Sequence, residues 1–173
     1  DVPFLHIADA ATDDVAARVP AGATVGVIAT GATHAIGLYS ARLERAGYRV
    51  AVPVDAGELQ AVAEGIAAVK RGEAEAGGHR FARVVAALER RGADAIVLGC
   101  TEVPPGLAAA GLRPGVPWVD PTDALARACV AAWARARSTP GARPRSSRPA
   151  RTRKRAWSGG GGRVGPPRSP PAA

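Results

Sequence analysis

The stretch Ala95-Ile96-Val97-Leu98-Gly99-Cys100-Thr101-Glu102 sets a short apolar run directly before a glycine, a thiol, a hydroxyl and a carboxylate. An apolar run without polar positions is typical of a strand that is buried on both faces, as in a parallel sheet. Gly99 allows the backbone to turn sharply where this strand ends. Because ligands of open α/β sheets bind at the carboxyl ends of the strands, the sequence predicts Cys100 at a ligand-binding edge.

Strand-like and helix-like segments alternate on both sides of this stretch. Strands are predicted over 24–29, 48–54, 95–98 and 116–119, and helices over 58–70 and 73–91. Pro117 favours an edge position for the last strand, because proline cannot donate to a ladder. The alternation predicts an α/β fold with a four-stranded parallel sheet, doubly wound in the Rossmann-like, three-layer manner, as a single domain plus a disordered tail.

The organisation along the chain is predicted in four parts. They are residues 1–22 with a strand at 2–7 and then a helix, the α/β domain at 23–120, a C-terminal helix at 121–137, and a disordered basic tail rich in Pro, Gly and Arg at 138–173. Cys129 lies on the apolar side of the C-terminal helix pattern. We therefore expect it to be a small buried hydrophobe.

The net charge of +8 is concentrated at the end of the chain. Residues 138–173 hold nine of the 23 basic residues and none of the 15 acidic ones, which leaves residues 1–137 with 14 basic against 15 acidic, a charge of about −1. The folded part therefore lacks the charge of a nucleic-acid-binding protein. Residues 151–157 combine basic side chains with a tryptophan, but we expect a solvated extension there rather than a nucleic-acid site.

The cysteines and histidines indicate neither a disulfide framework nor a metal site. Cys100 and Cys129 are too few for such a framework, and the three histidines have no metal-ligand spacing with one another or with Cys100. No signal-peptide pattern and no apolar run of membrane-spanning length occurs. The sequence thus predicts a cytoplasmic protein without a metal and without a membrane partner.

Residues 93–104, Ala-Asp-Ala-Ile-Val-Leu-Gly-Cys-Thr-Glu-Val-Pro, resemble the second cysteine motif of the aspartate/glutamate racemase family. Three other segments resemble this family in the expected order, namely residues 2–7, residues 27–39 and residues 119–123. Together these segments extend the resemblance over about residues 1–137.

The resemblance implies two similar α/β domains that face a cleft, each donating one cysteine. It implies a cofactor-independent racemase that inverts aspartate or glutamate by proton transfer at Cα and that is a homodimer when complete. The half with the first motif, of the Cys-Asn-Thr type, is absent from this sequence. We therefore expect residues 1–22 to link to a missing first domain, and we expect the chain alone to be inactive.

The chemistry requires a thiolate that removes the Cα proton and a thiol that protonates the opposite face, each with a pKa near the working pH. Cys100 is the candidate in this chain, and we expect hydroxyl and amide donors around it to favour its thiolate. Thr101 offers an amide and a hydroxyl to the substrate α-carboxylate. Glu102 is expected to orient the loop or to hold the substrate ammonium. The alternative for Cys100 is a buried thiol without chemistry.

Three further residues are assigned to substrate binding. Thr30 and Thr33 lie at the amino end of a predicted helix, which is a good carboxylate site, although the same residues are typical helix caps. The resemblance assigns Lys70 to the distal carboxylate, because aspartate-type members carry a lysine in this region. A solvated lysine that complements the helix dipole is the alternative for Lys70.

Two other functions stay open at the level of sequence. One is a decarboxylase or isomerase of dicarboxylates that uses a single cysteine, and a glycine in place of the first cysteine would favour it. The other is a degenerate module that binds a small carboxylate or a partner subunit without turnover.

Overall fold

A computed structural model describes residues 4–138 of the chain, and its centre is a four-stranded parallel sheet. The strands are β1 (Thr24–Ile28), β2 (Arg49–Ala51), β3 (Ala95–Leu98) and β4 (Trp118–Val119), in the order β2-β1-β3-β4. β1 and β3 form the middle of the sheet, where Val25 pairs with Ala95 and Ile28 with Leu98. The predicted α/β class, the parallel sheet and the edge position of the last strand are confirmed.

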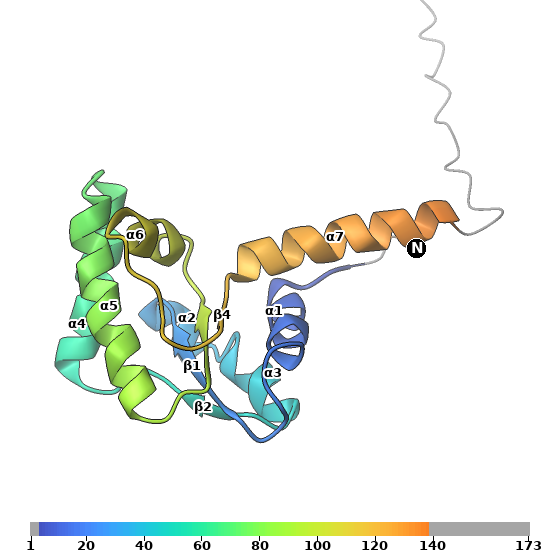
Figure 1. Cartoon of the computed structure of the whole chain (residues 1–173), viewed down its shortest axis with the longest axis horizontal. Coiled ribbons are helices and arrows are strands. Elements are labelled where there is room, and N and C mark those ends of the chain that lie inside the picture. Colours follow the sequence, from blue (N-terminus) through green and yellow to red (C-terminus); the bar gives the residue numbers. More distant parts are fainter. Residues whose placement is uncertain (1–3, 139–173) are drawn as a thin grey trace, which may run out of the picture. The chain divides into compact units, whose positions relative to one another are not determined.

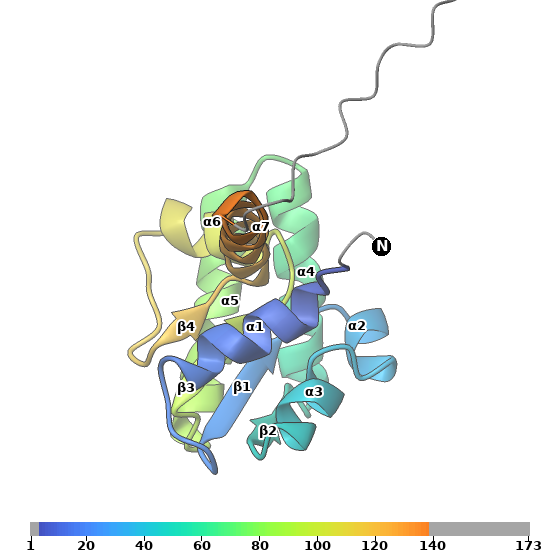
Figure 2. The same ribbon diagram turned by 90° about the vertical axis from the view of Figure 1, so that its right-hand side faces the viewer.

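Helices cover both faces of the sheet, as Figures 1 and 2 show. One face carries α1 (Ile7–Ala16), α3 (Ser40–Arg45) and the start of α7 (Pro121–Ser138). The other carries α4 (Ala56–Lys70), α5 (Ala74–Arg90) and α6 (Val103–Ala109). A short helix, α2 (Gly31–Ala35), follows the end of β1. The arrangement is the predicted three-layer, doubly wound fold.

The core is divided into two apolar clusters, one on each side of the sheet. Side chains alternate along a strand, so β3 sends Val97 into the cluster below α1 and Ile96 and Leu98 into the cluster below α4, α5 and α6. All four residues of β3 are buried. The continuous apolar run of this strand is therefore explained by helices on both faces.

The layer of α4, α5 and α6 is packed unusually closely at glycine positions. A Cβ on Gly78 of α5 would lie 2.0 Å from the carbonyl oxygen of Gly106 in α6. A Cβ on Gly65 of α4 would lie 2.5 Å from the ring of Phe81, which is fully buried. Because α6 begins at Val103, at the end of the loop that holds Cys100, this close approach also fixes the position of the cysteine loop.

The predicted strand at residues 2–7 is wrong over its described part. Residues 4–6 form no strand, and Ile7 begins α1. The side chain of His6 caps this helix, since its Nδ1 accepts a hydrogen bond of 3.1 Å from the amide of Ala8. The buried face of α1 starts at Ala8, so helical packing on the sheet outweighs the strand-like composition of the segment. Residues 2 and 3 lie outside the described residues.

The prediction that Cys129 is buried is also wrong. Only Pro121 and Ala124 of α7 are buried, whereas Cys129, Val130 and Trp133 are exposed. α7 packs on α1 through its first turns, and its later turns extend beyond α1 (Figure 1). Most apolar side chains on this face of α7 therefore do not pack against a core within residues 4–138. The predicted disordered tail, from residue 139 on, lies outside the described residues.

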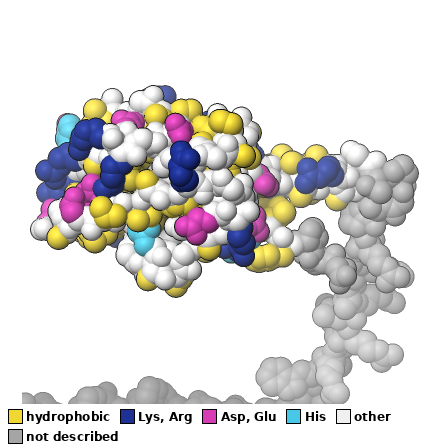
Figure 3. All heavy atoms as spheres, turned by 90° about the horizontal axis from the view of Figure 1, so that it is seen from below, with side chains coloured by type: hydrophobic (Ala, Val, Ile, Leu, Met, Phe, Trp, Pro, Cys, Tyr) yellow, Lys and Arg dark blue, Asp and Glu magenta, His cyan; other side chains and the backbone are white. Residues whose placement is uncertain are grey.

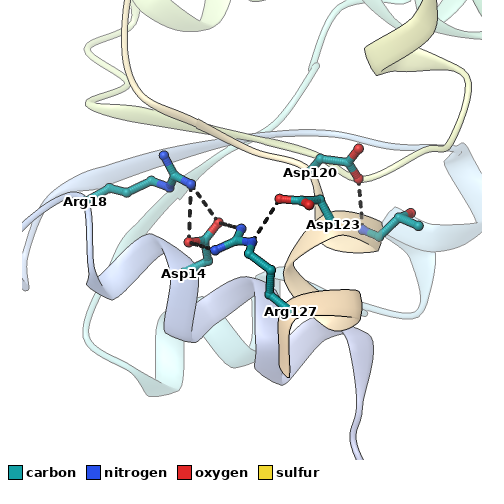
Figure 4. A network of polar contacts seen from close by, with 6 residues as sticks. Asp14, Arg18, Asp120, Asp123 and Arg127 are labelled. Atoms are coloured by element: carbon teal, nitrogen blue, oxygen red, sulfur yellow. Dashed lines mark hydrogen bonds and ion pairs between the residues drawn. The ribbon is translucent and has the colours of Figure 1, made fainter. Parts of the chain in front are cut away.

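A carboxylate of α1 anchors α7 (Figure 4). Asp14 accepts two hydrogen bonds from Arg127, of 2.9 and 3.2 Å, and two from Arg18, of 3.0 and 3.3 Å. Arg127 also donates to Asp123 at 2.9 Å. Burial opposes the ionisation of Asp14, but the hydrogen bonds from Arg127 and Arg18 outweigh it and lower the pKa of this carboxyl group.

Asp14→Asn is expected to lower the free energy of unfolding by about 1 kcal/mol near neutral pH, a modest loss because Arg127 is half exposed and screened. Since the pKa of Asp14 is lowered, its contribution is present above the ordinary carboxyl range and is lost as the pH falls through the lowered pKa. The two proteins should therefore converge in acid. Urea unfolding of Asp14→Asn and of the parent, at neutral pH and again in acid below the lowered pKa, measures the difference in free energy. Asp13→Asn, at an exposed neighbouring position, is the control. An equal loss in both variants would contradict the anchoring role.

The surface of the described part carries both signs of charge. Figure 3 shows basic and acidic side chains beside one another, with hydrophobic side chains between them. None of the described helices is both long and apolar enough to cross a membrane. The excess of positive charge in the sequence belongs to residues 138–173, as the composition predicts.

Candidate functional site

The carboxyl ends of the parallel strands bring several polar residues to one edge of the sheet. Thr30 follows β1, Cys100 follows β3 and Asp120 follows β4. Thr30 and Cys100 each lie two residues beyond the paired positions Ile28 and Leu98. The amide of Gly99 donates to the carbonyl of Ile28 at 2.7 Å, which continues the ladder up to the cysteine. The predicted placement of Cys100 at this edge is therefore what the fold produces.

The Cys100 thiol is bound to a carboxylate of its own loop. Its Sγ donates a hydrogen bond of 2.8 Å to Oε2 of Glu102, and the hydroxyl of Thr101 donates to the same oxygen at 3.1 Å. The other oxygen, Oε1, lies 3.7 Å from Nζ of Lys70 at the end of α4. The Glu102 side chain is 18% exposed, and Cys100 is half-buried. Four of the six predicted site residues thus form one connected cluster.

Electrostatics in this cluster keep the proton on sulfur. Burial, and then the hydrogen bond to the Glu102 carboxylate and its charge, raise the pKa of Cys100 to about 11. The hydrogen bond from the backbone amide of Glu102 and the charge of Lys70 act to lower this pKa, but together they do not outweigh burial and the carboxylate. The hydrogen bond from the thiol lowers the pKa of Glu102. The expectation that nearby donors favour the thiolate is wrong for this arrangement, because burial and the Glu102 carboxylate, which is an acceptor, outweigh the donors around Cys100.

Thr30 and Thr33 form the cap of α2. The amide of Thr33 donates to the hydroxyl of Thr30 at 3.1 Å, and the two hydroxyls lie 2.8 Å apart. Both hydroxyls are therefore engaged with each other, as the capping alternative predicts. Their position after β1 places them at the same sheet edge as Cys100.

Tyr39 is a neighbour of the cysteine that was not among the predicted site residues. Its side chain is buried, and its ring would lie 2.8 Å from a Cβ on Gly99. Glycine is therefore required there for the close contact with Tyr39, and not for the backbone turn, because the φ of Gly99 is not positive. Burial, followed by the negative charges of ionised Cys100 and Asp120, raises the pKa of the Tyr39 phenol. Tyr39 directly precedes α3 along the chain, and its contact with Gly99 depends on the fold.

A metal centre is not part of this arrangement. Within residues 4–138, no three His, Cys, Asp or Glu side chains are grouped so that they could hold a metal ion. The chemistry that the cluster offers is proton transfer by a thiol and binding of charged groups by Lys70 and Glu102.

The fold and this cysteine loop match a known protein family. The model of the Asp/Glu/hydantoin racemase family matches residues 1–129. The chain therefore belongs to this family, and the resemblance inferred from the cysteine motif is confirmed.

Solved structures of similar fold include three from this group. An aspartate racemase of Picrophilus torridus is 22% identical, with a TM-score of 0.61 over 76% of this chain and 53% of that one. An aspartate racemase homologue of Pyrococcus horikoshii OT3 is 22% identical, with a TM-score of 0.61 over 78% and 57%. A candidate Asp/Glu racemase of Yersinia pestis is 29% identical, with a TM-score of 0.58 over 77% and 56%. This chain spans little more than half the length of each.

Proposed function

We propose that the chain provides one acid/base half of a cofactor-independent amino-acid racemase of the aspartate/glutamate type. The observation that carries the proposal is the Cys100 thiol, held at the carboxyl end of β3 by Glu102 in a chain of the racemase family. The second proton-transfer group comes from outside the described residues, since Cys129 is exposed on α7.

In this mechanism a base on the far side of the substrate removes the Cα proton, and the electron pair stays on the carbanion. The Cys100 thiol then gives its proton to the opposite face of Cα, which leaves a thiolate on sulfur and an inverted amino acid. The reverse reaction starts from that thiolate. The raised pKa of Cys100 supports its role as the proton donor of the resting state.

The neighbours of Cys100 fit the charged groups of a dicarboxylic amino acid. We assign Lys70 to the distal carboxylate, and the substrate ammonium to Glu102, which would give up its contacts with Lys70 and the thiol on binding. The Thr101 amide and hydroxyl, with the donors of Thr30 and Thr33, are assigned to the α-carboxylate. Substrate binding would then free the thiol from its carboxylate acceptor at the moment when the thiol must face Cα.

Protection of Cys100 from alkylation tests the site. In a Cys129→Ser background, L-aspartate or L-glutamate is expected to slow the reaction of Cys100 with iodoacetamide at least fivefold at saturation, because the bound substrate covers the sulfur. Alanine, which lacks the distal carboxylate, should protect less. Lys70→Gln should abolish the preference for aspartate over alanine. Mass spectrometry measures the alkylation rate. An equal rate with and without these amino acids would contradict the assignment.

Proton exchange separates catalysis from binding. We expect this chain alone to produce no inversion of aspartate or glutamate in D₂O, observed by NMR and chiral chromatography, because one of two proton-transfer groups is present. Any exchange at Cα should be lost in Cys100→Ser and kept in Cys129→Ser. Rapid inversion by the chain alone would contradict the need for a second half.

A further inference from the structure

An apolar cavity is lined by residues of α6, of the segment that leads into β4 and of the end of β3. Figure 1 shows where these elements lie. The volume of this cavity is about 340 Å³, within the range of small-ligand sites. Its walls are formed mainly by Leu98, Pro104, Leu107, Leu112 and Trp118. The lining contains none of the residues of the Cys100–Glu102–Lys70 cluster, so this is a separate cavity.

Arg113 is the one charged side chain that lines this cavity among the described residues. It is exposed and makes no hydrogen bond or ion pair within residues 4–138. It also borders a second hollow that holds Asp120 and Asp123. Those carboxylates are engaged elsewhere, since Asp120 accepts from the amide of Thr122 and Asp123 pairs with Arg127. The guanidinium at the mouth of the apolar cavity therefore has five donors without an acceptor.

We propose that this cavity binds a small apolar monocarboxylate, with the apolar part against Leu107 and Trp118 and the carboxylate on Arg113. An apolar wall with one charged group at the mouth selects for a ligand that has one anionic end. Arginine suits a carboxylate because its planar fork can donate two parallel hydrogen bonds. An amino-acid substrate does not fit this description, since no carboxylate side chain lines the cavity to pair with its ammonium.

The position of the cavity ties its occupancy to the cysteine loop. Leu98 directly precedes Gly99 and Cys100, and Pro104 lies two residues after Glu102. A ligand between these walls would hold α6 and the end of β3 in place. We therefore expect occupancy to change the alkylation rate of Cys100, which a surface-bound additive would leave unchanged.

Trp118 provides the readout of binding. The other tryptophans are Trp133 and Trp157, so the double variant Trp133→Phe/Trp157→Phe leaves Trp118 as the single tryptophan, which is excited selectively over the tyrosines. Octanoate, titrated below its micellar concentration, is expected to change this fluorescence saturably. 1-Octanol, with the same chain length but no charge, should bind at least ten times more weakly because it cannot pair with Arg113.

Two variants decide whether the cavity is the site. Arg113→Gln should weaken octanoate binding at least tenfold and remove the discrimination against 1-octanol. Ala108→Phe, at an exposed lining position, should fill the cavity and abolish binding of both ligands. Arg45→Gln, an exposed arginine at the end of α3, is the matched control and should bind octanoate as the parent does. Absence of saturable binding, equal binding of both probes, or an unchanged affinity in Arg113→Gln would overturn the proposal.

Discussion

Glu102→Gln is expected to raise the rate at which iodoacetamide alkylates Cys100 near pH 8 by about tenfold. Iodoacetamide reacts with the thiolate, and at this pH only a small fraction of a thiol with a pKa of about 11 is ionised. The variant removes the negative charge that accepts the thiol proton at 2.8 Å, while the burial of Cys100 remains. A fall of about one pKa unit multiplies the thiolate fraction by about ten.

The pH dependence makes this prediction specific. In the wild type the alkylation rate should rise with pH until about pH 11, and in Glu102→Gln the whole profile should move to lower pH. Lys70→Gln should shift the profile in the opposite direction, because the charge of Lys70 favours the thiolate. All measurements use the Cys129→Ser background. Glu73→Gln, an exposed carboxylate paired with Arg71, is the matched control and should leave the profile unchanged. Overlapping profiles for Glu102→Gln and the parent would show that the carboxylate does not hold the proton on Cys100.

Gly78→Ala is expected to destabilise the protein by about 3 kcal/mol or more, the upper range for overpacking a core. The new Cβ would lie 2.0 Å from the carbonyl oxygen of Gly106 and 2.8 Å from the Cβ of Ala110. The first of these neighbours is backbone, so no side-chain rotation relieves the clash and α6 must move away from α5. Urea unfolding followed by far-UV circular dichroism measures the loss.

Gly31→Ala is the matched control for this substitution. Gly31 is also a glycine within a helix, but no heavy atom lies within 4 Å of the added Cβ, and its φ is negative. Gly31→Ala should raise the free energy of unfolding by less than about 1 kcal/mol, because alanine is more favourable than glycine in a helix. A displaced α6 should in addition alter the alkylation rate of Cys100 in any folded Gly78→Ala protein. If Gly78→Ala proved as stable as Gly31→Ala, the close packing of α5 against α6 at Gly78 would be contradicted.

The fold could be predicted because its signals are local. The buried run of β3 and the Gly-terminated helices follow from residue types and spacing, and β3 occupies Ala95–Leu98 as predicted. The bounds of the edge strands were harder to predict, since β2 pairs over Arg49–Ala51 although the apolar pattern covers residues 48–54. β2 ends at Ala51 although its partner β1 continues to Ile28, so the length of an edge strand is set by tertiary pairing and not by its own apolar pattern.

The candidate site was predictable in part for the same reason. Cys100, Thr101 and Glu102 are neighbours in sequence, so a single motif places them together. Lys70 reaches Glu102 from another helix, and its assignment came from the family resemblance. The contact of 3.7 Å places Lys70 beside the cysteine loop, and its role in substrate binding stays a prediction. Tyr39 was not predicted as a neighbour of Cys100, because only the packing of its ring on Gly99 brings it there.

The sequence by itself determined the alternation of the four sheet strands with helices, the location of a thiol at the end of a central strand, and the family. These properties follow from hydrophobic periodicity, from turn residues and from a contiguous motif. The tertiary structure alone decided that residues 4–6 are not a strand, that Cys129 is exposed and that the Cys100 proton is held by Glu102. Each of these depends on which surfaces meet, because burial and charge at a residue are set by neighbours that are distant along the chain.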